Sequence, residues 1–182
     1  KSSKDEWLSD YADLSNCYLS GTSAGGNIAY HLGLRAAAGD KDLEHLKIKG
    51  LILHQPYFGG VEVSGSELRL VNDLILPLHA SHTMWDLSLP VNADRDHEYC
   101  NPTVKGGSPL IERVRDLGWR ILVTGCYDDP LVDSCVESAK MLEAKGVRVV
   151  TQFGEGYHAM EIFEHFRAGD FYATVKDFIS SS

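Results

Sequence analysis

Apolar and polar positions divide most of the chain into short apolar runs and longer segments with helical spacing. The apolar runs lie near residues 16–21, 48–53, 119–124 and 147–153. Segments in which apolar side chains recur every three or four residues follow three of these runs, at 24–38, 131–145 and 161–179. Strands that alternate with helices predict an α/β protein built on a mostly parallel sheet with flanking helices.

Two regions depart from this alternation. Residues 55–110 leave a predicted strand through a turn-rich stretch and contain two short candidate helices, at 66–73 and 82–87. We expect this segment to be an insertion in a single domain that spans residues 1–182. At the start of the chain, residues 1–11 favour a helix with Trp7 and Leu8 as its buried side chains.

Composition narrows the range of partners and compartments. The 182 residues carry 17 basic and 26 acidic side chains, which gives a net charge of −9 and argues against nucleic acid or an anionic membrane as a partner. No apolar run in the sequence approaches the length of a membrane span. The four cysteines form no C-x-x-C pair, which favours a reducing compartment, the cytoplasm or also the nucleus, over disulfide or metal use.

The most informative motif is G-x-S-x-G, formed here by the five residues 21–25. It stands between a predicted strand and a predicted helix, and a serine at such a sharp turn has its hydroxyl exposed at the end of a sheet. The flanking glycines, Gly21 and Gly25, are expected because a Cβ would strain the turn. The start of the helix, with Ala24 and Gly25, offers backbone N–H groups to an oxyanion, and Ser23 is the candidate nucleophile.

A nucleophilic serine needs a base, and the base needs an acid that orients it. In hydrolases with this motif the order along the chain is Ser, Asp or Glu, then His. The predicted strand at 119–124 leads into a loop with Asp128 and Asp129, and Asp133 follows in the next predicted helix. Pro130 keeps Asp129 out of helical geometry, so the local sequence favours Asp129 and leaves Asp128 and Asp133 as alternatives.

The chain has eight histidines, and one of them has the position that this order requires. His158 ends a Gly-rich loop directly after the last predicted strand, so it is the candidate base. His54 ends an earlier strand and could face the same pocket as Ser23. Because the order Ser, His, Asp would not fit, we expect His54 to be a substrate contact at most.

These motifs together resemble plant carboxylesterases of the hormone-sensitive-lipase-like branch of the α/β-hydrolases, over nearly the whole chain. The stretches that carry the resemblance are residues 21–29, 49–53, 94–103, 125–133 and 156–158. The resemblance implies an α/β-hydrolase fold, with residues 55–110 forming part of a lid over the acyl pocket. It also implies Ser23 as nucleophile, Asp129 as acid, His158 as base, and the Ala24 N–H as an oxyanion donor.

The chain differs from this family's pattern in two places. Thr22, which we expect to be one of the oxyanion or substrate contacts together with Ala24, Gly25 and His54, stands where the family commonly has an acidic residue. The family also has a His-Gly-Gly-Gly loop upstream of the nucleophile, whose N–H groups complete the oxyanion hole, and 22 residues precede Ser23 here. We therefore expect the chain to be the C-terminal part of an α/β-hydrolase domain, with an N-terminal segment carrying that loop as its partner.

The function that this pattern predicts is a serine carboxylesterase, which hydrolyses small apolar carboxylic esters through an acyl-enzyme. Such a reaction requires no metal and no organic cofactor. Two alternatives use the same scaffold: a non-catalytic hormone receptor of the gibberellin-receptor type, and a lyase or cyclase. The complete set of Ser23, Asp129 and His158 favours catalysis over the receptor.

Overall fold

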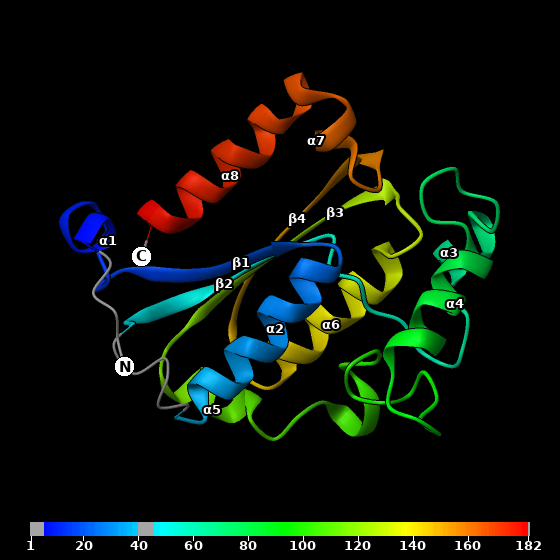
Figure 1. Ribbon diagram of the computed structural model, residues 1–182, viewed down its shortest axis with the longest axis horizontal. Coiled ribbons are helices and arrows are strands. Elements are labelled where there is room, and N and C mark those ends of the chain that lie inside the picture. Colours follow the sequence, from blue (N-terminus) through cyan, green and yellow to red (C-terminus); the bar gives the residue numbers. More distant parts are fainter. Residues whose placement is uncertain (1–5, 40–45, 182) are drawn as a thin grey trace.

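The structure of the protein is a computed structural model that describes residues 6–39 and 46–181 (Figure 1). Within these residues, parallel strands form one sheet in the spatial order β1 (Cys17–Thr22), β2 (Ile48–His54), β3 (Arg120–Asp128) and β4 (Arg148–Tyr157). Each strand thus lies beside the next one in the sequence. The predicted parallel α/β architecture is confirmed.

Helices cover both faces of the sheet (Figure 1). On one face, α2 (Ala24–Ala37) packs against β1 and β2, and α6 (Val132–Ala144) packs against β3 and β4. On the other face lies α8 (Ala168–Ser180). Side chains of β2 alternate between the two cores: Leu51 and Leu53 join the larger one beneath α2 and α6, whereas Ile52 packs against α8.

Residues 55–110, which we call the insertion, lie beyond the C-terminal ends of the strands (Figure 1). The insertion contains α3 (Gly65–Arg69), α4 (Leu78–Ser88) and the 3₁₀ turn η2 (Val104–Gly106), and α5 (Ile111–Asp116) leads back to the sheet. Its apolar residues divide into two groups. Tyr57, Phe58, Leu76 and Trp85 are buried, whereas Leu74, Ile75 and Met84 face solvent, Leu74 with 97% of its surface.

Several boundaries differ from those predicted. The strands β3 and β4 continue beyond 124 and 153, because Cys126 pairs with Gly154 and Asp128 with Tyr157. The predicted helix 161–179 is instead α7 (Met160–Phe163), the 3₁₀ turn η3 (His165–Arg167) and α8, with Glu164 in a non-helical conformation between the first two.

The expectation for the first helix was wrong at one side chain. The helix α1 (Glu6–Tyr11) forms, but Trp7 is 66% exposed, so it does not anchor this helix in the core. The Leu8 side chain lies outside the described part of the structure, as do residues 1–5. Across 6–39 and 46–181, no helix combines the length and the apolar character that a membrane span requires.

Candidate active site

Ser23 lies between the last residue of β1 and the first residue of α2, and its backbone has an unusual conformation. Its φ of 55° and ψ of −121° are far from both strand and helix values. Two hydrogen bonds, one to the last residue of β2 and one to the segment that follows it, hold it there. Ser23 N donates to the His54 carbonyl at 3.0 Å, and Tyr57 N donates to the Ser23 carbonyl at 2.9 Å. Ser23 therefore has the strained backbone that is typical of a nucleophile elbow, and its hydrogen bonds to His54 and Tyr57 stabilise this conformation.

The glycines of the motif have unequal roles. A Cβ on Gly21 would lie 2.1 Å from the Gly25 carbonyl oxygen, so the backbone of the turn would have to shift to accept it. The expectation for Gly21 is therefore confirmed. Gly25 has open space where its Cβ would lie, so the steric expectation is wrong at this position. The close approach is made by Gly26, where a Cβ would lie 3.0 Å from Pro56 Cα.

Asp129 follows the end of β3 and is 1% exposed. One carboxylate oxygen, Oδ1, accepts a hydrogen bond from Leu131 N at 2.9 Å. The other, Oδ2, lies 2.9 Å from His158 Nδ1. An ionised carboxylate accepts but does not donate hydrogen bonds, so with Asp129 ionised we assign the proton of this pair to Nδ1.

His158 follows β4 directly and is buried, and its second ring nitrogen reaches the serine. Nε2 lies 3.0 Å from Ser23 Oγ. With the proton on Nδ1, Nε2 is the acceptor for the serine hydroxyl. The ends of β1, β3 and β4 thus bring together Ser23, His158 and Asp129 in one hydrogen-bonded line, the arrangement that general-base activation of a serine requires.

The two alternative aspartates have other surroundings. Asp128 is exposed at the end of β3. Asp133 lies in the first turn of α6, where its Oδ2 accepts a hydrogen bond from Ser66 N at 2.7 Å. Ser66 Oγ in turn donates to the Pro130 carbonyl at 2.7 Å. Asp133 therefore fastens α3 of the insertion to the body of the molecule, and neither carboxylate contacts His158.

The residues expected around an oxyanion lie at the start of α2. Ala24 and Gly25 belong to its first turn, where backbone N–H groups have no partner inside the helix. Ala24 and Thr22 are exposed. Anion stabilisation at this end of the helix would come from backbone N–H groups and the positive end of the helix dipole.

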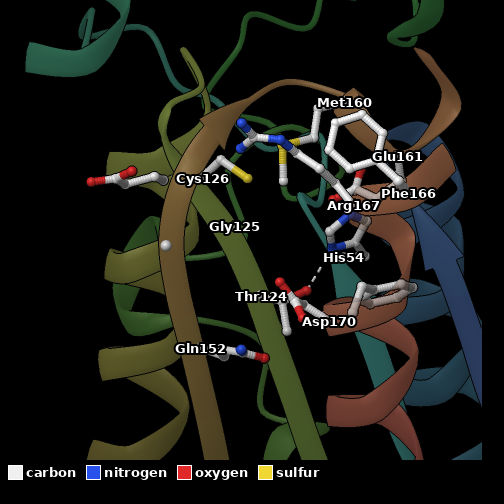
Figure 2. A pocket seen from close by; sticks show the side chains of 13 residues that line it. His54, Thr124, Gly125, Cys126, Gln152, Met160, Glu161, Phe166, Arg167 and Asp170 are labelled. Carbon is white, nitrogen blue, oxygen red and sulfur yellow. Dashed lines mark hydrogen bonds and ion pairs between the residues drawn. The ribbon is translucent and has the colours of Figure 1, made fainter. Parts of the chain in front are cut away.

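His54 is buried, and its ring is directed to the α8 side of the sheet (Figure 2). Nδ1 lies 2.6 Å from Thr124 Oγ1, and Nε2 lies 3.1 Å from Glu161 Oε2. The ring also packs on Phe171 with 4.1 Å between ring centroids. It lines a cavity of about 490 Å³ between the strand ends and α7–α8. The structure therefore brings the His54 carbonyl to Ser23, but it does not direct the ring there.

Sequence reasoning missed two polar residues that support this site. Asn27 Nδ2 donates to the carbonyls of Tyr57 and Tyr99, which ties α2 to the insertion. Gln55 is completely buried and bonds to the segment around His158. The available signal for both was their position: Asn27 lies one turn after Ser23, and Gln55 directly precedes a proline at a strand end. In the part of the chain that is described, no group of three or more His, Cys, Asp or Glu side chains could hold a metal ion.

A parallel sheet between helices, with a serine at a strand–helix elbow, is the architecture of one large fold family. A family model described as alpha/beta hydrolase fold matches residues 2–161. The chain therefore belongs to the α/β-hydrolase fold family, as its sequence predicted.

Curated relatives make the resemblance more specific. Carboxylesterase 20 of Arabidopsis thaliana is 48% identical over 182 residues, which are 100% of this chain and 56% of that protein. The 3-O-acetylpapaveroxine carboxylesterase CXE2 of Papaver somniferum is 46% identical over 159 residues, 87% of this chain and 50% of that protein. The chain spans about half the length of the curated relatives it matches. The predicted resemblance to plant carboxylesterases is confirmed.

Solved structures share the fold at low sequence identity. A fungal esterase structure from Rhizomucor miehei has a TM-score of 0.71 and 19% identity, covering 97% of this chain and 57% of its own. The esterase Est22 has a TM-score of 0.70 and 22% identity, covering 97% of this chain and 53% of its own. These similarities support the fold.

Proposed function

We propose that this chain carries the nucleophile, base and acid of a serine carboxylesterase. The observation that carries the proposal is the continuous contact from Ser23 Oγ through the His158 ring to Asp129, at 3.0 and 2.9 Å. The carboxylesterase relatives support the same reaction class. A complete nucleophile–base–acid line favours turnover over hormone binding without chemistry.

In the first half of the proposed reaction, Ser23 Oγ attacks the ester carbonyl carbon while His158 Nε2 takes the hydroxyl proton. Asp129 holds the imidazole through Nδ1 and stabilises the imidazolium that forms. The tetrahedral intermediate then breaks the bond to the alcohol, which leaves with the proton from Nε2. In the second half, His158 takes a proton from water, the resulting hydroxide attacks the acyl-serine, and Ser23 regains its proton as the acid departs.

The negative charge on the tetrahedral intermediate needs fixed hydrogen-bond donors. We propose that the Ala24 N–H is one of them, because it begins α2 directly after the nucleophile. The Gly25 N–H in the same turn and the exposed Thr22 are the other candidates near this position. A Gly-rich segment outside these 182 residues would supply the remaining donors, by resemblance to the family.

The proposed substrate is a small apolar carboxylic ester. The insertion contains apolar side chains that do not pack into the body, among them Leu74, Ile75 and Met84. Exposed apolar groups of this kind on a lid would favour an apolar ligand. We propose the insertion as part of a lid over the acyl group. The proposed reaction uses no metal and no organic cofactor.

The four cysteines, all free in the structure, favour the cytoplasm as the compartment of the protein.

The test is covalent labelling of the full-length protein with a fluorophosphonate probe. Ser23 should be labelled, and Ser23→Ala should remove both labelling and hydrolysis of short-chain aryl esters, because loss of the nucleophile costs about 10⁶ in turnover. The matched control is Ser20→Ala, since Ser20 is exposed on the same strand. Hydrolysis at the normal rate by Ser23→Ala would end the proposal, and tight binding of the ester without turnover would favour a receptor.

A further inference from the structure

Gln55 is a polar residue buried in an unusual backbone conformation. It directly follows β2, its exposed fraction is 0%, and its φ is 45°, in the left-handed region that non-glycine residues rarely adopt. Gln55 N donates to the Thr124 carbonyl at 2.7 Å, so the contact between β2 and β3 continues through it. A buried amide needs hydrogen-bond partners, and residues with strained backbones concentrate at functional sites.

The side-chain amide bonds to the backbone on both sides of His158. Gln55 Oε1 accepts a hydrogen bond from Ala159 N at 2.8 Å, and Gln55 Nε2 donates to the Tyr157 carbonyl at 3.1 Å. Nε2 also lies 3.3 Å from Cys126 Sγ. These partners determine the orientation of the amide, because the Ala159 N–H requires an acceptor, the amide oxygen, and the Tyr157 carbonyl requires a donor, the amide nitrogen.

These two bonds hold the backbone at the point where the pairing of β4 with β3 ends, since Tyr157 still pairs with Asp128 and Ala159 lies beyond the strand. The strand β4 ends at Tyr157, and Ala159 has a φ of 57°, so the chain turns sharply at His158. Gln55 adds a bond to the last residue of the strand and holds the first residue after His158, beyond the strand. Gln55 therefore supports the backbone on both sides of the residue that carries the ring.

The same short segment also holds the nucleophile. The His54 carbonyl accepts the Ser23 N–H, and the Tyr57 N–H donates to the Ser23 carbonyl. Residues 54–57 therefore contact the backbone of Ser23 directly and the backbone around His158 through one side chain. One piece of chain therefore supports the backbone of both reacting groups.

We infer that Gln55 is a positioning residue that keeps His158 Nε2 in line with Ser23 Oγ; this rests on the proposed esterase function. Gln55 does not contact the hydroxyl, the ring or any reacting atom. Its contribution is geometric: a displacement of the base by about 1 Å can lower the rate about 10²-fold.

Gln55→Glu tests the inference with almost no change in shape. An ionised glutamate can still accept from Ala159 N, but it places a carboxylate oxygen against the Tyr157 carbonyl, which has lost its donor. We expect kcat in the full-length protein to fall about 10²-fold at pH 8, with KM little changed. Protonation restores a donor, so the variant should recover relative to the wild type as the pH is lowered. Once kcat is divided by the folded fraction at each pH, a residue with a merely structural role would give no such change in the pH profile.

Two controls separate positioning from loss of fold. Gln152→Glu makes the same chemical change at an exposed position on β4 and should leave kcat unchanged. Gln55→Asn keeps the amide but is too short to reach both partners, so it should also lower kcat. For each variant, kcat is divided by the fraction of folded protein from circular dichroism, and the Nδ1 proton resonance of His158 is followed by NMR.

The outcomes distinguish this inference from the proposed function. If the wild type is neither labelled by the fluorophosphonate nor active, the proposed function fails. If the wild type is labelled but folded Gln55→Glu and Gln55→Asn react at the wild-type rate with an unchanged His158 resonance, the inference about Gln55 is wrong. A lower rate together with a shifted resonance in either folded variant supports it.

Discussion

At the scale of single residues, two adjacent aspartates at the end of β3 have opposite environments. Asp129 is buried against the His158 ring, and Asp128 is exposed. We predict that Asp129→Asn lowers kcat by about 10⁴, because an amide at this position permits the wrong imidazole tautomer. Asp128→Asn should lower it less than about threefold, since surface substitutions have small effects. Steady-state ester hydrolysis measures both, and a severe Asp128→Asn would contradict the assignment.

Gly21 and Gly25, on either side of Ser23, differ in how much room they leave for a side chain, and this difference predicts different effects on stability. Gly21→Ala would force a Cβ to within 2.1 Å of the Gly25 carbonyl oxygen, whereas Gly25→Ala meets no atom within 4 Å. We predict that Gly21→Ala lowers the free energy of unfolding by about 1–3 kcal/mol, the usual cost of overpacking.

Gly25→Ala should be neutral or slightly stabilising, because alanine favours helix by up to about 1 kcal/mol over glycine. Denaturant unfolding of the full-length protein measures both variants. Equal stability of the two would show that the elbow relaxes around residue 21.

At the scale of secondary-structure elements, α3 is held to α6 by Asp133. Asp133→Ala removes the acceptor of the Ser66 N–H, a bond to a charged group worth about 1.5–3 kcal/mol. We predict that amide hydrogen exchange in α3 becomes about 10- to 100-fold faster. Turnover should fall less than about tenfold, far below the effect of Asp129→Asn. Glu137→Ala, at an exposed position on α6, is the matched control and should leave α3 unchanged.

The sequence predicted best those elements whose own side chains decide whether they are buried. The strands begin within one residue of the predicted positions, because the apolar runs mark buried sheet. The ends are less predictable, since Asp128 and Tyr157 extend β3 and β4 by pairing with each other. Glycine and aspartate in these stretches favour loops when considered alone, and cross-strand pairing overrides that preference.

The spacing of apolar residues in the sequence indicated neither the break before α8 nor the role of Gln55. Glu164 interrupts the helix while its side chain accepts a hydrogen bond from Tyr157 Oη at 2.9 Å and pairs with Arg167. Gln55 bonds across 102 and 104 positions in the sequence. Both depend on contacts between distant segments, and local spacing cannot indicate these. The meeting of Ser23, Asp129 and His158 was predictable because each follows a strand end.

At the scale of the whole molecule, the two edges of the sheet differ in how well they are protected against pairing with another strand. At one edge, β4 carries Arg148 and Glu155 and contains glycines. At the other, β1 reads Cys-Tyr-Leu-Ser-Gly-Thr, without charge or proline, and no strand in the described residues pairs with its outer side. An edge strand of this kind favours pairing with another strand or aggregation. We propose that a further strand of the same protein, leading to the Gly-rich oxyanion loop, pairs with β1.

The prediction compares the 182-residue chain with the full-length protein. In the full-length protein, the amides on the outer side of β1 should be protected from hydrogen exchange; in the shorter chain they should exchange quickly, and the chain should aggregate. If it folds, its turnover should be lower by about 10²–10³ for each missing oxyanion donor. Exchange mass spectrometry, light scattering and ester hydrolysis measure the three quantities. A monomeric, fully active 182-residue chain would show that α2 and its neighbours supply every donor the reaction needs.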